Sequence, residues 1–197
     1  MRTTMVFLRA AAAAAVTILA AGARAQETGT VESAFLQLSL FPPVQLVSTH
    51  TPIEGFRLGL FSMNTDMTGF DAGVLTWTTE DLTALQFGLV NVVEERAVGV
   101  QFGTVNIVGK KAVGWQNGFL NIDGDGFVGF QEGAVNIVGG EKAVGVQLGA
   151  VNYSSAVTGL QLGLVNITPQ LSGIQIGVVN IATNAAIPVL PVVNASF

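Results

Sequence analysis

An eight-residue phrase recurs along most of the chain and restricts its fold more than any other feature. It reads Gly-x-Gln-x-Gly-x-(Val/Leu)-Asn, and its first clear copy carries Ala84 in place of the leading glycine. Successive copies are 14 to 16 residues apart, and such a period indicates a repeat architecture in which each copy is one structural unit. The clear copies end at Asn91, Asn106, Asn121, Asn136, Asn152, Asn166 and Asn180.

Weaker copies extend the pattern at both ends. They span Gly55 to Ser62, Gly69 to Thr76 and Pro188 to Asn194, which gives ten units in a repeat domain of residues 52–197. Terminal units of a repeat protein have a neighbour on one side only, so degraded copies are expected there. Pro188 and Pro191 suit a last strand, because proline has no N–H to donate to a further one. Residues 26–51 are predicted to form an N-terminal cap.

The first 25 residues have the pattern of a bacterial export signal. Arg2 and Arg9 precede an apolar run from Ala10 to Ala21, and Ala23-Arg24-Ala25 forms a small-x-small cleavage site. The apolar run is too short to span a bilayer. We therefore expect a signal peptide over 1–25 and an exported protein, located in the periplasm, in the outer membrane or at the cell surface.

Composition excludes several classes of protein and partner. The chain has no cysteine, so no disulfide can stabilise it. Without the three arginines of the signal, five basic residues stand against 13 acidic ones, which is a net charge of −8. This excess argues against nucleic acid and anionic lipid as partners. Because 50% of residues are hydrophobic and 11% are charged, we expect a folded chain.

Within each unit the local pattern predicts a strand, and two all-β architectures remain compatible with it. Gly159 to Leu164 alternates large apolar residues with small or polar ones, which is the period of two of a strand. Each unit could be one coil of a parallel β-solenoid. Alternatively, each unit could be one strand of an antiparallel meander or small β-barrel.

Side-chain pairing between units favours the solenoid. If Thr168 and Leu171 flanked a two-residue hairpin loop, Leu164 would lie opposite Gln175, and leucine faces would merge with glutamine faces. In a solenoid, equivalent positions stack on one another, and an inserted residue bulges out at a turn. The prediction is therefore a solenoid of about ten units of 14–16 residues with capped ends.

Four columns of equivalent residues follow from such a stack. Two of them are expected to form the core: the residues after the first glycine (Phe56, Phe70, Leu85, Val100, Trp115, Phe130, Val146, Leu160, Ile174) and those after the asparagine (Met63, Trp77, Val92, Ile107, Ile122, Ile137, Tyr153, Ile167, Ile181). The other two carry amides that can hydrogen-bond along the stack. They are Gln86, Gln101, Gln116, Gln131, Gln147, Gln161 and Gln175, and the seven asparagines named above.

The repeat, the Phe-Pro-Pro-Val-Gln-Leu segment at 41–46 and the Leu-Pro-Val-Val-Asn-Ala-Ser-Phe ending at 190–197 resemble an uncharacterised bacterial family of exported surface-repeat proteins. The resemblance covers nearly all of the chain after the signal and implies no catalytic residues. The Gln-x-Gly-x-x-Asn core, as in Gln161, Gly163 and Asn166, is also similar to curlin repeats, which form β-solenoids. Curlin units are longer and carry further Ser and Gln positions that this chain lacks.

One segment resembles a calcium-binding loop. Asn121, Asp123, Asp125 and Glu132 match the oxygen-ligand spacing of such a loop, with Gly126 at its turn position. The competing interpretation is a plain Asp-Gly-Asp-Gly turn, because the repeat already requires Asn121 and strands rather than helices flank the segment.

Asn117 and Glu132 stand out in a column that is otherwise apolar. They lie in adjacent units, at the position that other units fill with residues such as Leu58, Phe87 and Leu148. An unpaired charge in a buried column is costly, so we expect the column to be partly exposed there, or the pair to mark a polar site.

No residue set in the sequence predicts an enzyme. His50 is the only histidine, which excludes the usual zinc clusters and the Cys–His dyad. No nucleotide-binding or serine-hydrolase motif is present, and no cofactor is expected. We therefore expect a non-enzymatic structural or binding protein of the bacterial cell envelope or surface. Its partner is unknown and could be a second copy or a membrane. The alternative is a small outer-membrane β-barrel protein.

Overall fold

The computed structural model describes residues 32–197, and the predicted signal peptide lies outside them. Within this range every regular element is a strand. No helix there has the length and apolar character needed to cross a bilayer. The strands are β1 (Ala34–Phe41), β2 (Val44–Gln45), β3 (Ile53–Asn64), β4 (Met67–Thr78), β5 (Leu82–Val93), β6 (Ala97–Phe102), β7 (Val105–Val108), β8 (Lys111–Asn117), β9 (Leu120–Asp123), β10 (Gly126–Val138), β11 (Ala143–Ser154), β12 (Val157–Thr168), β13 (Leu171–Ala182) and β14 (Val189–Ser196).

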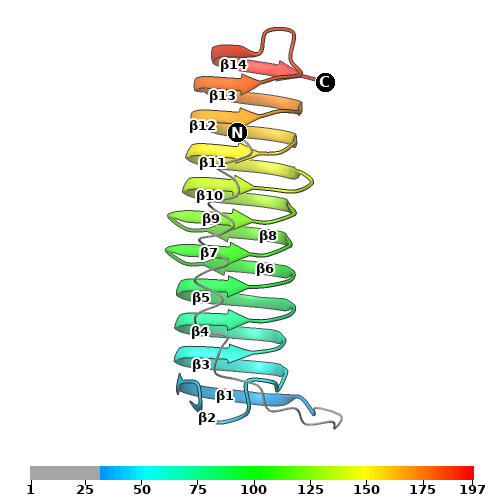
Figure 1. Cartoon of the computed structure of the whole chain (residues 1–197). Coiled ribbons are helices and arrows are strands. Elements are labelled where there is room, and N and C mark those ends of the chain that lie inside the picture. The colour runs from blue at the N-terminus through cyan, green and yellow to red at the C-terminus, as the bar shows by residue number, and fades with distance from the viewer. Residues whose placement is uncertain (1–31) are drawn as a thin grey trace. The chain divides into compact units, whose positions relative to one another are not determined.

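Successive repeats stack in the same direction and in register, which confirms the β-solenoid prediction (Figure 1). In β12, for example, Gly159 pairs with Gly145 on one side and Gly173 on the other, and Asn166 pairs with Asn152 and Asn180. The spacing between repeats varies from 14 to 16 residues. The extra residues lie in the turns, so the register of the repeat phrase is kept. An antiparallel meander or barrel would require neighbouring repeats to run in opposite directions, but the repeats from β3 to β13 pair in parallel.

Each coil folds the chain back on itself at the second glycine of the phrase. In the third coil, the side chains of Leu82, Ala84, Gln86, Asn91 and Val93 point inward, and the neighbours of Gln86 and Asn91 in the chain point outward. Glycine is required at this bend because the asparagine side chains fill the space beside it. A Cβ on Gly118 would lie 2.8 Å from Asn106 Nδ2 and 2.9 Å from Asn121 Oδ1. Contacts this close do not occur in folded proteins, so the repeated glycine follows from the repeated asparagine.

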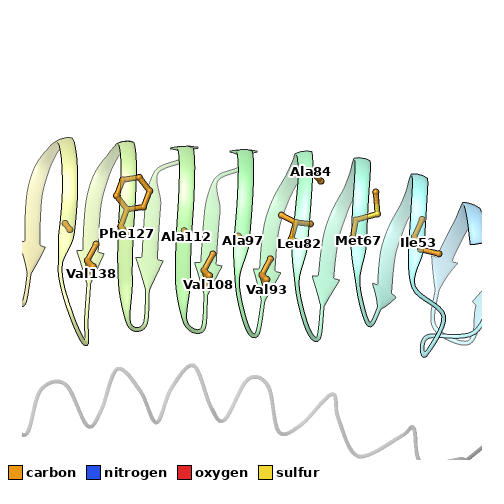
Figure 2. Close-up of a cluster of buried hydrophobic side chains, with 11 residues drawn as sticks. Ile53, Met67, Leu82, Ala84, Val93, Ala97, Val108, Ala112, Phe127 and Val138 are labelled. Atoms are coloured by element: carbon orange, nitrogen blue, oxygen red, sulfur yellow. The ribbon is translucent and has the colours of Figure 1, made fainter. Parts of the chain in front are cut away.

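The interior has an apolar part and a polar part. Its apolar part comes from the fourth residue before each glutamine position, as in Met67 and Phe127, and from the second residue after several of the asparagines, as in Val138. Figure 2 shows these side chains following one another along the stack. The polar part is formed mainly by the glutamines and asparagines, which lie nearer the bend and are buried in every clear repeat.

The two columns expected to form the core point outward instead. Leu85, Trp115 and Phe130, which follow the first glycine, are 36–40% exposed. In the column after the asparagine, Trp77 is buried but its neighbours are partly exposed. The physical reason is side-chain alternation: these residues neighbour the glutamine or asparagine in sequence, so they lie on the opposite side of the strand. Amides that bond to one another along the stack can occupy the interior, and the large apolar residues of these two columns lie outside.

The two ends of the stack differ from the predicted repeats. The last unit, Pro188 to Asn194, was expected to continue the parallel stack, but β14 runs antiparallel to β13. At the other end β1 adds a parallel layer to β3, and β2 folds back antiparallel to β1. β1 and β2 lie within the predicted cap of residues 26–51.

Candidate functional site

The buried glutamines form one continuous hydrogen-bonded ladder. Each Nε2 donates to the Oε1 of the preceding glutamine at 2.7–2.9 Å, from Gln175 back to Gln86. Gln86 in turn donates to Asp71 Oδ2 at 2.7 Å. All donors therefore point toward the N-terminal end of the stack, where a carboxylate accepts the last hydrogen bond.

A buried ion pair closes this end of the glutamine ladder. Arg57 and Asp71 occupy the glutamine position in the first two coils, in register with each other and with Gln86. The Arg57 guanidinium donates Nε to Asp71 Oδ1 at 2.8 Å and NH2 to Oδ2 at 2.6 Å, and both side chains are fully buried. This two-pronged contact neutralises the carboxylate that the ladder needs as its terminal acceptor.

The asparagines form a second ladder that runs the opposite way. Each Nδ2 donates to the Oδ1 of the following asparagine at 2.8 Å, from Asn91 to Asn180. Its other hydrogen goes to a backbone carbonyl at the bend of the next coil, as from Asn136 to Leu148. Thr76 Oγ1 donates to Asn91 Oδ1 at the start of the ladder. Asparagine therefore holds each bend and links it to the neighbouring coil.

A second buried acidic group, Asp123, lies beside the glutamine ladder without a cation. Gln116 Nε2 donates to its Oδ1 at 3.0 Å and Gln131 Nε2 to its Oδ2 at 2.7 Å. None of the ion pairs among residues 32–197 includes it. Burial raises the pKa of the Asp123 carboxyl well above its ordinary value of 3.8, and the two amide donors offset this only in part.

We expect Asp123→Val to stabilise the protein at neutral pH by about 1–3 kcal/mol, the usual cost of burying a polar group without full compensation. Val108 and Val138 occupy the same position in the adjacent coils, so the interior accepts this side chain. Because the folded-state pKa is raised, the carboxyl's contribution is most favourable below the unfolded pKa and is lost as the pH rises through the folded pKa. The stability gain should therefore shrink as the pH is lowered toward 3.8.

Urea unfolding across this pH range measures the effect, with Asp125→Asn in the same turn as the control. Asp125 is exposed, so its variant should stay within about 0.5 kcal/mol of the parent protein. A less stable Asp123→Val protein at neutral pH would contradict the prediction.

The structure distributes the four calcium candidates over different parts of the coil. Asn121 belongs to the asparagine ladder, and Asp123 faces the interior. Asp125 is exposed at a turn, and Glu132 lies on an outer face, where Asn117 Nδ2 donates to its Oε2 at 3.1 Å. Among the described residues, no three His, Cys, Asp or Glu side chains are grouped to hold a metal ion.

Charged residues are concentrated along one side of the solenoid, the turn edge. We use this name for the turns between coils, residues 65–66, 79–81, 94–96, 109–111, 124–126, 139–142, 155–156 and 169–170. Between residues 52 and 182, the charged residues elsewhere are Arg57, Asp71 and Asp123 inside and Glu54 and Glu132 outside. Ion pairs Arg96–Asp81 and Lys110–Glu95 join neighbouring turns along this edge.

The other sides of the coil are mainly apolar. The first face carries the residues on either side of each glutamine, and the second face carries those on either side of each asparagine. Between them lies the corner column, the third residue after each glutamine position. It contains Leu60, Val74, Leu89, Thr104, Phe119, Ala134, Ala150, Leu164 and Val178, of which Leu60 and Leu164 are both 59% exposed.

Aromatic side chains form a row on the first face. Ring centroids of successive members lie 5.1–6.2 Å apart, in mostly tilted or edge-to-face arrangements. Such contacts stabilise neighbouring coils and leave ring edges and faces open to a partner. The row contains Phe35, Phe56, Phe70, Phe87, Phe102, Trp115 and Phe130.

A shallow hollow of about 690 Å³, the corner groove, follows the bend beyond this row. Phe119 and Leu164 stand at its ends, and the small side chains Ala134 and Ala150 lie between them. Asn117 and Glu132 line the groove together with apolar residues of the first face. The sequence marked Asn117 and Glu132 as unusual, but not the groove, which arises from two alanines where the flanking coils have phenylalanine and leucine.

Comparison with known protein families, with curated proteins and with solved structures finds no match to this chain.

Proposed function

We propose that this protein is a non-enzymatic, exported structural or binding protein of the bacterial cell envelope, which attaches to its partner through the apolar sides of the solenoid. The observation that carries the proposal is the segregation of side chains. Ionised groups gather on the turn edge, whereas the faces and the corner column expose leucine, valine, isoleucine and phenylalanine.

Large exposed apolar surfaces are unusual on proteins that act alone in water, and they mark sites for other proteins or for membranes. The amides, which might have made such a surface polar, are used up inside as structural ladders. The export pattern of residues 1–25 supports a location in the envelope. Apart from Glu54 and Glu132 on the outer faces, the charged side chains of residues 52–182 are buried in or beside the ladders or spread along the turn edge, which supports a binding role.

The corner column offers a direct test. Leu60→Lys with Leu89→Lys places two cations on exposed positions outside the corner groove, where folding should be unaffected. Ser155→Lys with Gln170→Lys adds the same charge to the turn edge and serves as the matched control. Each form is expressed with its N-terminal segment in a bacterial host, and cells are separated into soluble and envelope fractions.

The parent protein and the turn-edge control should be found in the envelope fraction. The corner variant should move to the soluble fraction while keeping the β-rich circular dichroism of the parent. A parent protein that stays in the cytoplasm, or a corner variant retained as well as the control, would contradict the proposal.

A further inference from the structure

We infer that the corner groove binds a linear apolar molecule that ends in a protonated amine. This inference rests on the proposed binding role and names the ligand chemistry of one part of the surface. It follows from the shape of the groove, from its apolar walls and from a carboxylate at one end of it.

The groove extends along the stack, because its lining residues come from successive coils. In the column after each glutamine, Glu132 is followed in register by Leu148, Leu162 and Ile176. With Asn117 before them, the column passes four inter-strand spacings, a length of about 19 Å. The corner alanines lie beside the middle of this path. An extended alkyl chain can follow this apolar path from coil to coil.

The end of the groove at Glu132 is polar and acidic. The Glu132 side chain accepts one hydrogen bond, from the neutral amide of Asn117, and none of the ion pairs among residues 32–197 includes it. Leu148 and Phe102 lie beyond the pair in the same column. A carboxylate in this setting can still accept hydrogen bonds and attracts a cation. An ammonium group supplies both the charge and the donors.

The volume of the hollow, about 690 Å³, is in the usual range for small-molecule sites. Charge selects between amphiphiles: a fatty acid would bring a second carboxylate next to Glu132, whereas a primary alkylamine brings the opposite charge. The apolar walls provide affinity through the alkyl chain, and Glu132 provides the preference for the amine.

Titration calorimetry of the purified protein tests this with two probes of equal chain length, dodecylammonium and dodecanoate, both below their micelle concentrations. We expect saturable binding of dodecylammonium at a single site and at least tenfold weaker binding of dodecanoate. In Glu132→Gln the affinity for dodecylammonium should fall about tenfold, which corresponds to one charge-assisted hydrogen bond. Glu54→Gln, at an acidic residue that also lies off the turn edge but outside the groove, should leave binding unchanged.

A second variant tests the apolar part of the groove. Ala150→Leu introduces the residue that Leu89 and Leu164 provide in the same column, so the fold should accept it while the groove is filled. It should weaken binding of dodecylammonium at least tenfold. Ala72→Leu, at a position in register with Leu58 and outside the groove, is its control and should bind like the parent.

Failure to bind dodecylammonium, equal binding of the two probes, or unaltered binding in either groove variant would overturn the assignment. These results would not affect the envelope proposal, because its test uses Leu60 and Leu89, which do not line the groove. Conversely, loss of the envelope location would leave the calorimetric result as it stands.

Discussion

Replacing Asn136 with aspartate is expected to lower the free energy of unfolding by about 3–5 kcal/mol, the range found when a buried polar contact is left with an uncompensated charge. Asn136 Nδ2 donates to Asn152 Oδ1 at 2.8 Å and to the Leu148 carbonyl at 2.9 Å. Aspartate has no hydrogen to donate to either, so three oxygens would face one another in a buried space. The charge adds a desolvation cost that the asparagine does not have.

Gln170→Glu is the matched control for this variant. It changes an amide to a carboxylate on the turn edge, where water solvates the charge, and its effect should stay within about 0.5 kcal/mol. Urea unfolding followed by circular dichroism measures both. An Asn136→Asp protein as stable as the control would mean that the asparagine column does not hold the bends together.

The second large effect concerns the ion pair at the end of the glutamine ladder. Asp71→Gln leaves the buried Arg57 guanidinium without its carboxylate, and Arg57→Gln leaves the buried Asp71 without its cation. Each single change is expected to destabilise the protein by about 3–5 kcal/mol.

The double variant Arg57→Gln with Asp71→Gln should recover most of this loss. It places in the first two coils the residue that the following seven coils carry, so the ladder can continue by amide-to-amide hydrogen bonds. We expect the double variant to lie within about 2 kcal/mol of the parent, since a buried ion pair is often replaceable as a unit. A double-mutant cycle from urea unfolding gives the coupling between the sites. If the loss of stability in the double variant equalled the sum of the two single losses, Arg57 and Asp71 would not act as a pair.

The direction and register of the stack could be predicted from the sequence because the repeat phrase is nearly invariant. Equivalent positions such as Gly145, Gly159 and Gly173 pair directly, as the solenoid prediction requires. The amides were expected to bond along the stack, and the structure shows this for every glutamine and asparagine of the clear repeats.

The side of the strand that faces inward was predicted wrongly, for a reason that can be stated in physical terms. Leu85 and Trp115 were assigned to the core because large apolar residues usually occupy it. Small residues flank each glutamine on its own side of the strand, two glycines in every clear repeat except that of Gln86, and they show which side is crowded. At Gly118 a Cβ would meet the asparagine side chains, whereas the position of Trp115 is open. The spacing of small residues was therefore the better signal.

The ladder end at Arg57 and Asp71 was also missed in the sequence. Both residues lie in degraded copies of the phrase, which lack both the glutamine and the asparagine that identify the clear copies. Opposite charges at the same position of adjacent repeats, 14 residues apart, were the signal available. The corner groove could not be predicted, because it depends on how Ala134 and Ala150 lie relative to the bend.

Hydrogen exchange of the side-chain amides, followed by NMR, tests the buried ladders most directly. The NH₂ groups of the ladder glutamines and asparagines, such as Gln131 and Asn136, are buried and bonded, so they should exchange only when the coils open. The exposed amide of Gln170 provides the unprotected reference within the same protein. Strong protection of the ladder amides relative to Gln170 is the predicted result. Ladder amides that exchange as fast as Gln170 would show that they face water, and a solenoid with a polar interior would then be excluded.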